Sequence, residues 1–257
     1  MLTPSIKKKA FGQHFLHNRR IAESIVDTMM LQPDDRVVEI GPGAGALTTI
    51  LLTRLKSLEV IEIDEEVIPF LQRNCCHTNH LHIYHADVLK FDFHQFDYRF
   101  RLIGNLPYNI STPILFYLTQ YLPQIRDMYF MLQREVAERI IANPGSKIYG
   151  RLSVMMQYHF EVASIMSISP AVFTPAPKVD SSLVKFLPRL PVSPNPLLGN
   201  IVRDAFCMRR KTLTNSLRRY ITAQQLAALN IDPKLRPEML EVAQFVRIAD
   251  EVARNIG

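Results

Sequence analysis

"VVEIGPGAGALTTILL", residues 37–52, predicts a β-strand, a glycine-rich turn and the start of a helix. Glycines at 41, 43 and 45 permit positive φ angles and a close approach of the backbone to a ligand, while free N–H groups at the helix start favour a carboxylate or a phosphate. Ala46 stands where the dinucleotide fingerprint has its third glycine. The spacing of Gly41, Gly43 and Gly45 therefore leaves the cofactor open.

Glu39, two residues before the first glycine, favours one cofactor over the others. An acidic residue at this strand end is usual in proteins that bind S-adenosyl-L-methionine, because that ligand brings an ammonium group to the turn. We therefore expect an S-adenosyl-L-methionine site lined by Glu39 and the three glycines.

Beyond this stretch, short β-rich runs alternate with amphipathic segments from Arg36 to residue 142. This alternation predicts βαβ units and a mostly parallel sheet, with ligands at the carboxyl ends of the strands. A helix over 153–160 and two further runs, 161–168 and 179–187, predict a closing antiparallel pair. The expected fold class is α/β, a Rossmann-like domain with a small all-helical C-terminal domain.

Residues 187–198, "LPRLPVSPNPLL", contain four prolines and predict a linker. The segment after it, 197–257, has helical spacing and no convincing strand. We expect one domain over residues 1–188 and a second, helical domain over residues 189–257.

Composition narrows the protein class. The chain has 257 residues and a formal charge of +6, with basic clusters near its two ends, which favours a polyanionic partner. Two of its three cysteines are sequence neighbours and poorly placed for a mutual disulfide, which fits a reducing compartment. No signal peptide or membrane span is evident. We expect a cytoplasmic monomer that binds no metal and no membrane.

Two further acids follow the next strands. Glu62 lies near the end of the second strand, where a carboxylate can accept hydrogen bonds from ribose hydroxyls. Asp64 competes for that role, but Asp64-Glu65-Glu66 is typical of a helix N-cap. Asp87, at the end of the third strand, is a candidate acceptor for the adenine amino group of the cofactor. Each acid alone is more often a cap or a surface charge; their arrangement at successive strand ends favours a site.

"NLPY", residues 105–108, ends the fourth strand at the same edge. It is a good turn sequence, and Tyr108 could simply pack. The alternative is chemical, because an exocyclic amine needs hydrogen-bond acceptors to become a nucleophile. The Asn105 side chain and the carbonyl of Leu106 or Pro107 can supply them, while Tyr108 stacks on a flipped-out base.

Seven motifs in order resemble the ribosomal RNA adenine dimethyltransferases: "FGQHFL", "EIGPGAGALT", "VIEID", "GNLPYNISTP", "QREVAERI", "YGRLSV" and "FTPAPKVDS". The resemblance runs from Phe11 to Ser182, with a weaker continuation through "FCMRRKTLTNSL". It is strongest to bacterial enzymes that dimethylate two adjacent adenines near the 3′ end of 16S rRNA.

This resemblance implies that residues 1–188 form an S-adenosylmethionine-dependent methyltransferase domain, the catalytic domain, and that residues 189–257 form a helical RNA-binding domain. It also implies roles for further residues. The family's FGQNFL segment folds over the cofactor, which implies that Gln13, His14 and Leu16 line the site. His14 stands where that pattern has asparagine, so the hydrogen bond at this position is open. Phe173 resembles the residue that faces the target base opposite Tyr108.

The helical domain of such enzymes helps to bind RNA, and helical spacing would put residues 211 and 218 on one face. The implied phosphate contacts are Arg209, Arg210, Lys211, Arg218 and Arg219.

The expected function is therefore methyl transfer from S-adenosyl-L-methionine to N6 of two adjacent adenines in the 3′-terminal hairpin of 16S rRNA, in the 30S ribosomal subunit. Three alternatives stay open from the sequence. One is a 23S rRNA adenine methyltransferase of the macrolide-resistance type, which "FTPAPKVDSSLV" and a long basic C-terminal helix disfavour. Another is a non-catalytic RNA-binding assembly factor, and the weakest is a dehydrogenase.

Overall fold

A computed structural model describes residues 14–75, 80–189, 195–208 and 210–256. The strands are β1 (Phe15–Leu16), β2 (Val37–Ile40), β3 (Leu58–Glu62), β4 (Leu81–His85), β5 (Phe100–Asn105), β6 (Ile125–Gln133), β7 (Phe160–Ile168), β8 (Phe173–Thr174) and β9 (Ser181–Pro188). The helices are α1 (Arg19–Asp27), α2 (Thr48–Leu51), α3 (Ile68–Asn74), α4 (Ser111–Leu118), α5 (Arg134–Ile141), α6 (Arg151–His159), α7 (Leu198–Cys207), α8 (Leu213–Ser216), α9 (Ala223–Ala228) and α10 (Val242–Ile256). Short 3-10 turns are η2 (Val88–Lys90), η3 (Phe93–Gln95), η4 (Thr119–Tyr121), η5 (Pro170–Val172) and η6 (Pro237–Met239).

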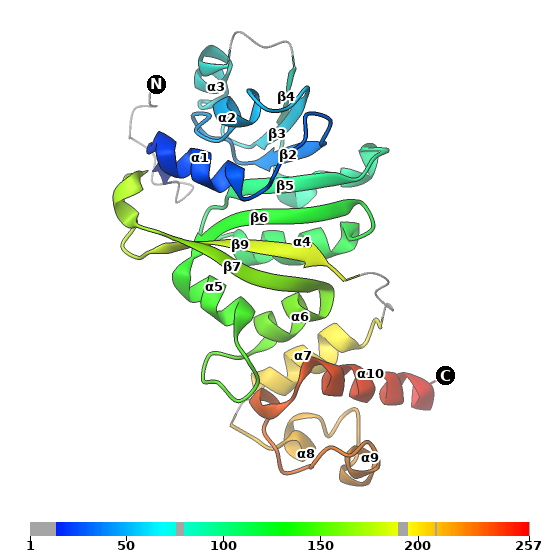
Figure 1. Cartoon of the computed structure of the whole chain (residues 1–257). Helices are drawn as coiled ribbons and strands as arrows, with labels where there is room; N and C mark the ends of the chain where they lie inside the picture. The colour runs from blue at the N-terminus through cyan, green and yellow to red at the C-terminus, as the bar shows by residue number, and fades with distance from the viewer. Residues whose placement is uncertain (1–13, 76–79, 190–194, 209, 257) are drawn as a thin grey trace. The chain divides into compact units, whose positions relative to one another are not determined.

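Seven strands form one sheet in the order β4-β3-β2-β5-β6-β9-β7 (Figure 1). The pairings among β4, β3, β2, β5 and β6 are parallel, and β9 joins β6 antiparallel. The order reverses at β2, which is the position where open α/β sheets bind ligands. The predicted Rossmann-like α/β fold is confirmed.

Opposite faces of the sheet carry different cores because strand side chains alternate. On one face, Ile103 of β5 packs in a cluster that includes Ile25 of α1, Leu51 of α2 and Leu71 of α3. On the other face, Phe100 of the same strand joins aromatic side chains that follow β4. Its neighbours there include Phe93 and Phe96, with ring centroids 5.6 Å from that of Phe100 in both cases.

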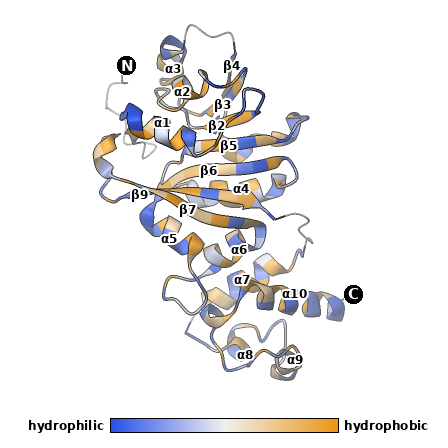
Figure 2. Ribbon diagram, in the orientation of Figure 1, coloured by the Kyte–Doolittle hydropathy of each residue, from blue (hydrophilic) through white to orange (hydrophobic). Residues whose placement is uncertain are grey.

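The chain forms two compact units. The first comprises Met1–Ala137 and Ala163–Pro188, and the second comprises Glu138–Val162 and Arg189–Gly257. The second unit therefore takes in α6 and the second half of α5, in addition to the residues after 188 that the sequence assigned to a helical domain. Within it, α6 and α10 pack against α7, and α10 alternates hydrophobic and hydrophilic residues along its length (Figure 2). Among the described residues, no helix combines the length and apolar character needed to cross a membrane.

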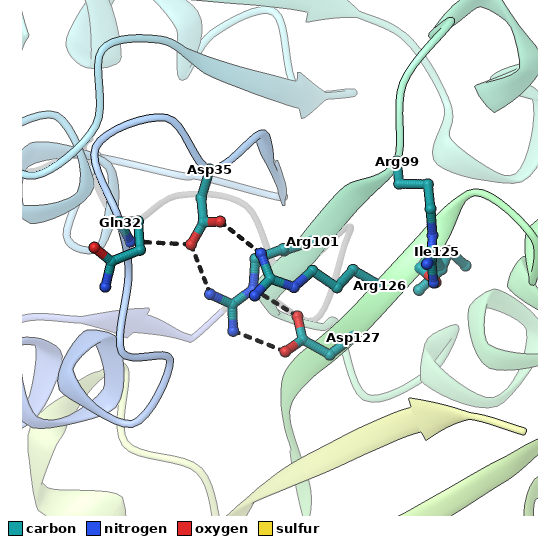
Figure 3. A network of polar contacts seen from close by, with 7 residues as sticks. All are labelled: Gln32, Asp35, Arg99, Arg101, Ile125, Arg126 and Asp127. Atoms are coloured by element: carbon teal, nitrogen blue, oxygen red, sulfur yellow. Dashed lines mark hydrogen bonds and ion pairs between the residues drawn. The ribbon is translucent and has the colours of Figure 1, made fainter.

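A buried ion-pair network joins the amino-terminal ends of β5 and β6 (Figure 3). The Arg101 guanidinium donates to both carboxylate oxygens of Asp127 at 2.7 Å and to Asp35 at 2.9 Å. Asp35 also accepts from Arg126 at 2.7 Å and from the Gln32 N–H at 3.0 Å. Burial alone would raise the pKa of Asp35, but these N–H donors and the two guanidinium charges lower it below its ordinary value.

Arg101→Leu tests the network, because it leaves the buried carboxylates of Asp35 and Asp127 without their shared cation. We expect the free energy of unfolding, measured by urea titration at pH 7, to fall by about 3–5 kcal/mol. Lys56→Ala is the matched control. It removes an exposed ion pair with Asp34 and is expected to cost at most about 1 kcal/mol. Equal losses in the two variants would contradict a structural role for the network.

Candidate active site

A cavity of about 260 Å³ opens at the carboxyl ends of β2, β3, β4 and β5. Its walls are mostly apolar, and a small number of polar side chains reach it. These are His14, Glu39, Glu62, Asp87, Asn105, Tyr108 and Asn109. Such a mixture suits a ligand with a flat apolar part and a few hydrogen-bonding groups.

The register between β2 and β5 places two motifs side by side. Ile40 lies opposite Gly104 in the parallel pairing, so Gly41 and Asn105 leave neighbouring strand ends together. A side chain at Gly104 would collide with the Ile40 carbonyl oxygen. This close approach explains why the apolar run of β5 ends in glycine immediately before Asn105.

The glycine turn differs in one respect from its sequence interpretation. Gly41, Gly43 and Gly45 have φ angles of +67°, +54° and +89°, as a turn of this kind requires. Their N–H groups are not free, however. They donate to Ile61 O at 2.9 Å, Glu62 Oε2 at 3.2 Å and Pro42 O at 2.9 Å, respectively. These three amides are already committed within the protein and are not available to a pyrophosphate.

Glu39 is buried beneath this turn, with 1% of its surface exposed. Burial raises the pKa of its carboxyl to about 8, and the neighbouring charge of Glu62 adds to the rise. The Thr48 hydroxyl opposes it by donating to Oε2 at 2.7 Å. A carboxyl in this state is stabilised as its anion by a cationic ligand.

Glu62 is held rigidly in the cavity wall. Its Oε1 accepts from the N–H groups of Ile63 and Asp64, both at 2.9 Å, and Oε2 accepts from Gly43. Burial raises the pKa of Glu62 above its ordinary value against these three donors, which lower it. Asp64 does not line the cavity. Its Oδ1 accepts from the Glu66 N–H at 3.0 Å and caps the turn that leads to α3.

Asp87 combines both roles that the sequence left open. Its Oδ1 caps η2 by accepting from the Leu89 N–H at 2.9 Å, and the residue also lines the cavity. The carboxylate can therefore present its second oxygen to a ligand while the cap stays in place.

The "NLPY" residues line the cavity together. The Asn105 Nδ2 donates to the His14 carbonyl at 2.7 Å, which leaves Oδ1 as the acceptor of that amide. The Tyr108 hydroxyl lies 2.7 Å from Ser181 Oγ. Burial raises the pKa of Tyr108, although Ser181 lowers it, so the phenol is neutral at pH 7 and cannot serve as a strong base.

An N-terminal strap, residues 14–17, lies across the glycine turn. Its strand β1 pairs antiparallel with β8, so that Phe15 is opposite Thr174 and Leu16 opposite Phe173. The Phe15 ring is 3.1 Å from the position that a Cβ of Gly43 would occupy. The strap thus brings His14 and Leu16 to the cavity beside the turn.

The family described as ribosomal RNA adenine dimethylase matches residues 5–254. The chain belongs to that family. Members of the ribosomal RNA adenine dimethylase family methylate adenine in ribosomal RNA, with S-adenosyl-L-methionine as the donor. The resemblance inferred from the seven motifs is confirmed. The site also fits this cofactor, because a buried carboxyl of raised pKa, Glu39, gains from a cationic ligand.

Relatives and solved structures agree with the dimethylase assignment. The chain is 49% identical to the ribosomal RNA small subunit methyltransferase A of Methylobacillus flagellatus, covering 96% of this chain and 98% of the relative. It is 45% identical to the protein of the same description from Pseudomonas fluorescens, over 96% and 94% of the two chains. A dimethyladenosine transferase from Plasmodium falciparum superimposes with a TM-score of 0.83 at 28% identity, over 94% and 98%. The 23S rRNA methyltransferase ErmE, with a TM-score of 0.74 at 24% identity over 93% and 99%, shares the fold.

Not every expected dimethylase site residue lies on the cavity wall. Phe173 is 2% exposed and packs in the core, where its strand pairs with β1, and it does not line the cavity. Gly45 also lies off the wall, and a Cβ at this position would meet the side chains of Leu71 and Cys75, at the end of α3. Gln13 lies outside the described residues.

The expected RNA contacts of the dimethylase are exposed but not on one helix face. Arg210, Lys211, Arg218 and Arg219 are exposed, whereas Arg209 lies outside the described residues. The long basic helix expected here is wrong: α8 has only four residues, Leu213–Ser216, with Lys211 before it and Arg218 after it. Thr212 is the N-cap of α8 and has an extended backbone, so Lys211 lies outside the helix and helical periodicity does not relate it to Arg218.

The sequence interpretation missed the apolar cavity wall of the dimethylase. Ile63, Val88 and Leu89 follow the same strand ends as Glu62 and Asp87 and line the cavity. Ile63 is 43% exposed, which is high for a large apolar side chain beside a buried strand. Its position directly after the candidate acid Glu62 is the sequence feature that could have identified Ile63 as a cavity residue. Among the described residues, no group of three or more potential metal-ligating side chains occurs.

The raised pKa of Glu39 gives the dimethylase a testable pH dependence. The carboxyl binds its proton more tightly in the folded state than in the unfolded state, where its pKa is near 4.5. Folding stability is therefore lost as pH rises from 4.5 through about 8. In thermal scans without ligand, we expect the melting temperature of Glu39→Gln to fall less between pH 5 and about pH 8.5 than the melting temperature of wild type.

The same variant should bind S-adenosyl-L-methionine about 10- to 100-fold more weakly, because a charge-assisted hydrogen bond is removed. Calorimetry should also find that wild-type affinity rises between about pH 6 and pH 7.5, below the range in which the amino group of the ligand loses its proton, while that of the variant stays flat. Parallel pH profiles for the two proteins would contradict this role of Glu39.

Proposed function

We propose that this protein transfers methyl groups from S-adenosyl-L-methionine to N6 of two adjacent adenines in the 3′-terminal hairpin of 16S rRNA, in the 30S ribosomal subunit. The modification is a step of small-subunit biogenesis. The names of the bacterial relatives support the small subunit as the target, at 49% and 45% identity over nearly the whole chain.

The orientation of the Asn105 amide carries the chemical part of the proposal. Its Nδ2 is occupied by the His14 carbonyl, so Oδ1 is the group left to accept a hydrogen bond from an amine in the cavity. Leu106 and Pro107 follow directly in the cavity wall, and the Pro107 carbonyl already accepts from the Ile110 N–H at 3.1 Å, so the Leu106 carbonyl is the better candidate for a second acceptor. Proline fixes the local backbone and hence the direction of these acceptors.

The donor supplies a methyl group that is already activated by its sulfonium centre. With the cofactor bound, the adenine N6 lone pair would form the new N–C bond as the methyl group leaves sulfur, which would keep the C–S electron pair, and the proton lost from N6 would pass to solvent water. Asn105 and the neighbouring carbonyl would hold the N6 hydrogens, which orients the lone pair and stabilises the charge that builds on nitrogen. Alignment contributes most, about 7–11 kcal/mol in well-oriented reactions.

Methyl transfer to N6 beside Asn105 requires no strong base. Tyr108 is a neutral phenol whose hydroxyl is engaged with Ser181, and it offers a ring face for the target base. We further propose that the protein acts in the cytoplasm as a monomer, without a metal.

Asn105→Ala tests the proposed chemistry. With labelled cofactor and 30S subunits that lack the modification, wild type should transfer methyl groups, and the variant should be slower by about 10- to 100-fold in kcat. Mass spectrometry of the rRNA nucleosides identifies dimethyladenosine. Asn255→Ala, an exposed asparagine that bonds to Glu251 at 3.4 Å, is the control and should match wild type.

Three outcomes would redirect the assignment. Transfer to 23S rRNA but not to 30S subunits would favour the macrolide-resistance type of enzyme. An Asn105→Ala protein that binds 30S subunits normally and rescues every growth defect would favour a non-catalytic assembly factor. Calorimetric binding of a nicotinamide dinucleotide in place of S-adenosyl-L-methionine would favour a dehydrogenase.

Exposed cations of the second unit support an RNA-binding role. Lys211 and Arg218 make no ion pair with any residue the structure describes, whereas Arg219 lies 4.0 Å from Asp204. Unpaired cations of this kind can neutralise phosphates at little cost. Structured RNA is read mainly through its shape and backbone, so a non-specific electrostatic contribution is expected.

Replacing both Lys211 and Arg218 with alanine should weaken binding to 30S subunits. It should also reduce the slope of log K against log salt concentration by about 0.7–0.9 for each phosphate that the protein no longer neutralises. Filter binding at four salt concentrations measures the slope, and Lys56→Ala, an exposed lysine of the first unit, is the control. An unchanged slope would assign these cations to another role.

A further inference from the structure

His14 contacts both Asn105 and Tyr108 of the "NLPY" segment, although 91 residues of the chain separate it from Asn105. Its backbone carbonyl accepts from Asn105 Nδ2 at 2.7 Å. Its imidazole ring lies 5.2 Å from the Tyr108 ring, centroid to centroid, with 34° between the ring planes. His14 therefore touches the acceptor amide through its main chain and the stacking ring through its side chain.

The imidazole is itself fixed by a third segment. Its Nδ1 lies 2.6 Å from the Pro175 carbonyl oxygen and donates to it in the Nδ1–H tautomer. The pairing of β1 with β8 holds the two segments together at residues 15–16 and 173–174. The ring has little freedom to turn away from Tyr108 while this hydrogen bond persists.

The spacing of the two rings decides where a target base can lie. A base inserted between two rings needs about 7 Å between their planes, twice the carbon contact distance of about 3.5 Å. The His14 and Tyr108 centroids are only 5.2 Å apart, so no base fits between them. Phe173, the residue expected to face Tyr108, is buried in the core and does not line the cavity.

We infer that His14 is a positioning residue that backs the Tyr108 ring, so that the target adenine stacks on the Tyr108 face turned away from the imidazole. Ser181 fixes the hydroxyl of the same tyrosine at 2.7 Å, and the two contacts together set its ring plane. This inference rests on the proposed methyl transfer to adenine and adds the residue that orients its base-stacking ring.

Three substitutions separate the ring from its hydrogen bond. His14→Phe keeps an aromatic ring against Tyr108 and removes the bond to Pro175, His14→Asn keeps a polar donor and removes the ring, and His14→Ala removes both. We expect His14→Ala and His14→Asn to lower kcat/KM for 30S subunits by about three- to tenfold. His14→Phe should be at least about threefold faster than His14→Ala, because it restores a ring against Tyr108. Calorimetry with S-adenosyl-L-methionine separates a loss of cofactor binding, which these two variants should share, from the loss of the ring contact.

His17→Ala is the matched control. His17 belongs to the same strap and lies 3.1 Å from Thr174 Oγ1, but its ring makes no contact with Tyr108 in the described structure. It should retain wild-type kcat/KM. An equal loss in His17→Ala, or a His14→Phe variant as slow as His14→Ala, would overturn the inference. So would a His14→Ala variant at least as fast as wild type, because His14 would then obstruct the base.

A double-mutant cycle tests whether His14 acts through Tyr108. The effects of His14→Ala and Tyr108→Ala on kcat/KM should be non-additive, with His14→Ala adding less than twofold once Tyr108 is gone. The same cycle in urea unfolding reports the ring contact without any substrate, and additive effects there would overturn the contact itself. If the wild-type protein methylated no ribosomal RNA, the proposed function would be refuted. The unfolding cycle would still test the ring contact, because it needs no substrate.

Discussion

The site depends on the register of two neighbouring parallel strands. Ile40 of β2 lies opposite Gly104 of β5, and the backbones approach so closely that position 104 has no room for a side chain. The residues that follow, Gly41 and Asn105, are thereby delivered to the same point at the edge of the sheet. One turn offers a place for a methyl donor, and the other offers acceptors for an amine. Shifting β5 by one residue would move the side chain of Asn105 to the opposite face of the sheet.

Charges at the two ends of the sheet have opposite effects. At the amino ends, the Arg101 network satisfies its buried carboxylates with guanidinium groups. At the carboxyl ends, Glu39 and Glu62 are buried with only neutral donors around them, and burial raises the pKa of both. This arrangement costs folding stability and prepares the cavity for a cation. Such a division between a stabilising end and a strained, ligand-binding end is expected of an enzyme.

Much of the fold could be predicted from strong local patterns. The strand, glycine turn and helix at residues 37–52, with the alternation after it, indicated the parallel sheet and the edge where the acids gather. The features that the sequence did not predict depend on contacts between residues far apart in the chain. The amides of the glycine turn are occupied because Glu62 and backbone carbonyls reach them, which no spacing reveals. Strands β1 and β8 have two residues each, too few for a period, and their pairing buries Phe173. The basic segment around Lys211 is interrupted by turns that helical spacing did not predict.

The path of the chain between its two compact units limits how the protein can be divided. The polypeptide passes from one unit to the other after Ala137, returns after Val162 and leaves again after Pro188. Helix α6, on the middle excursion, packs against α7 and α10, which follow the last crossing. A protein truncated after residue 188 would therefore contain α6 without the helices that cover its apolar side. A protein that begins at residue 189 would contain α7 without α6. The two halves are interlaced in sequence and have to be inherited, expressed and engineered as one piece.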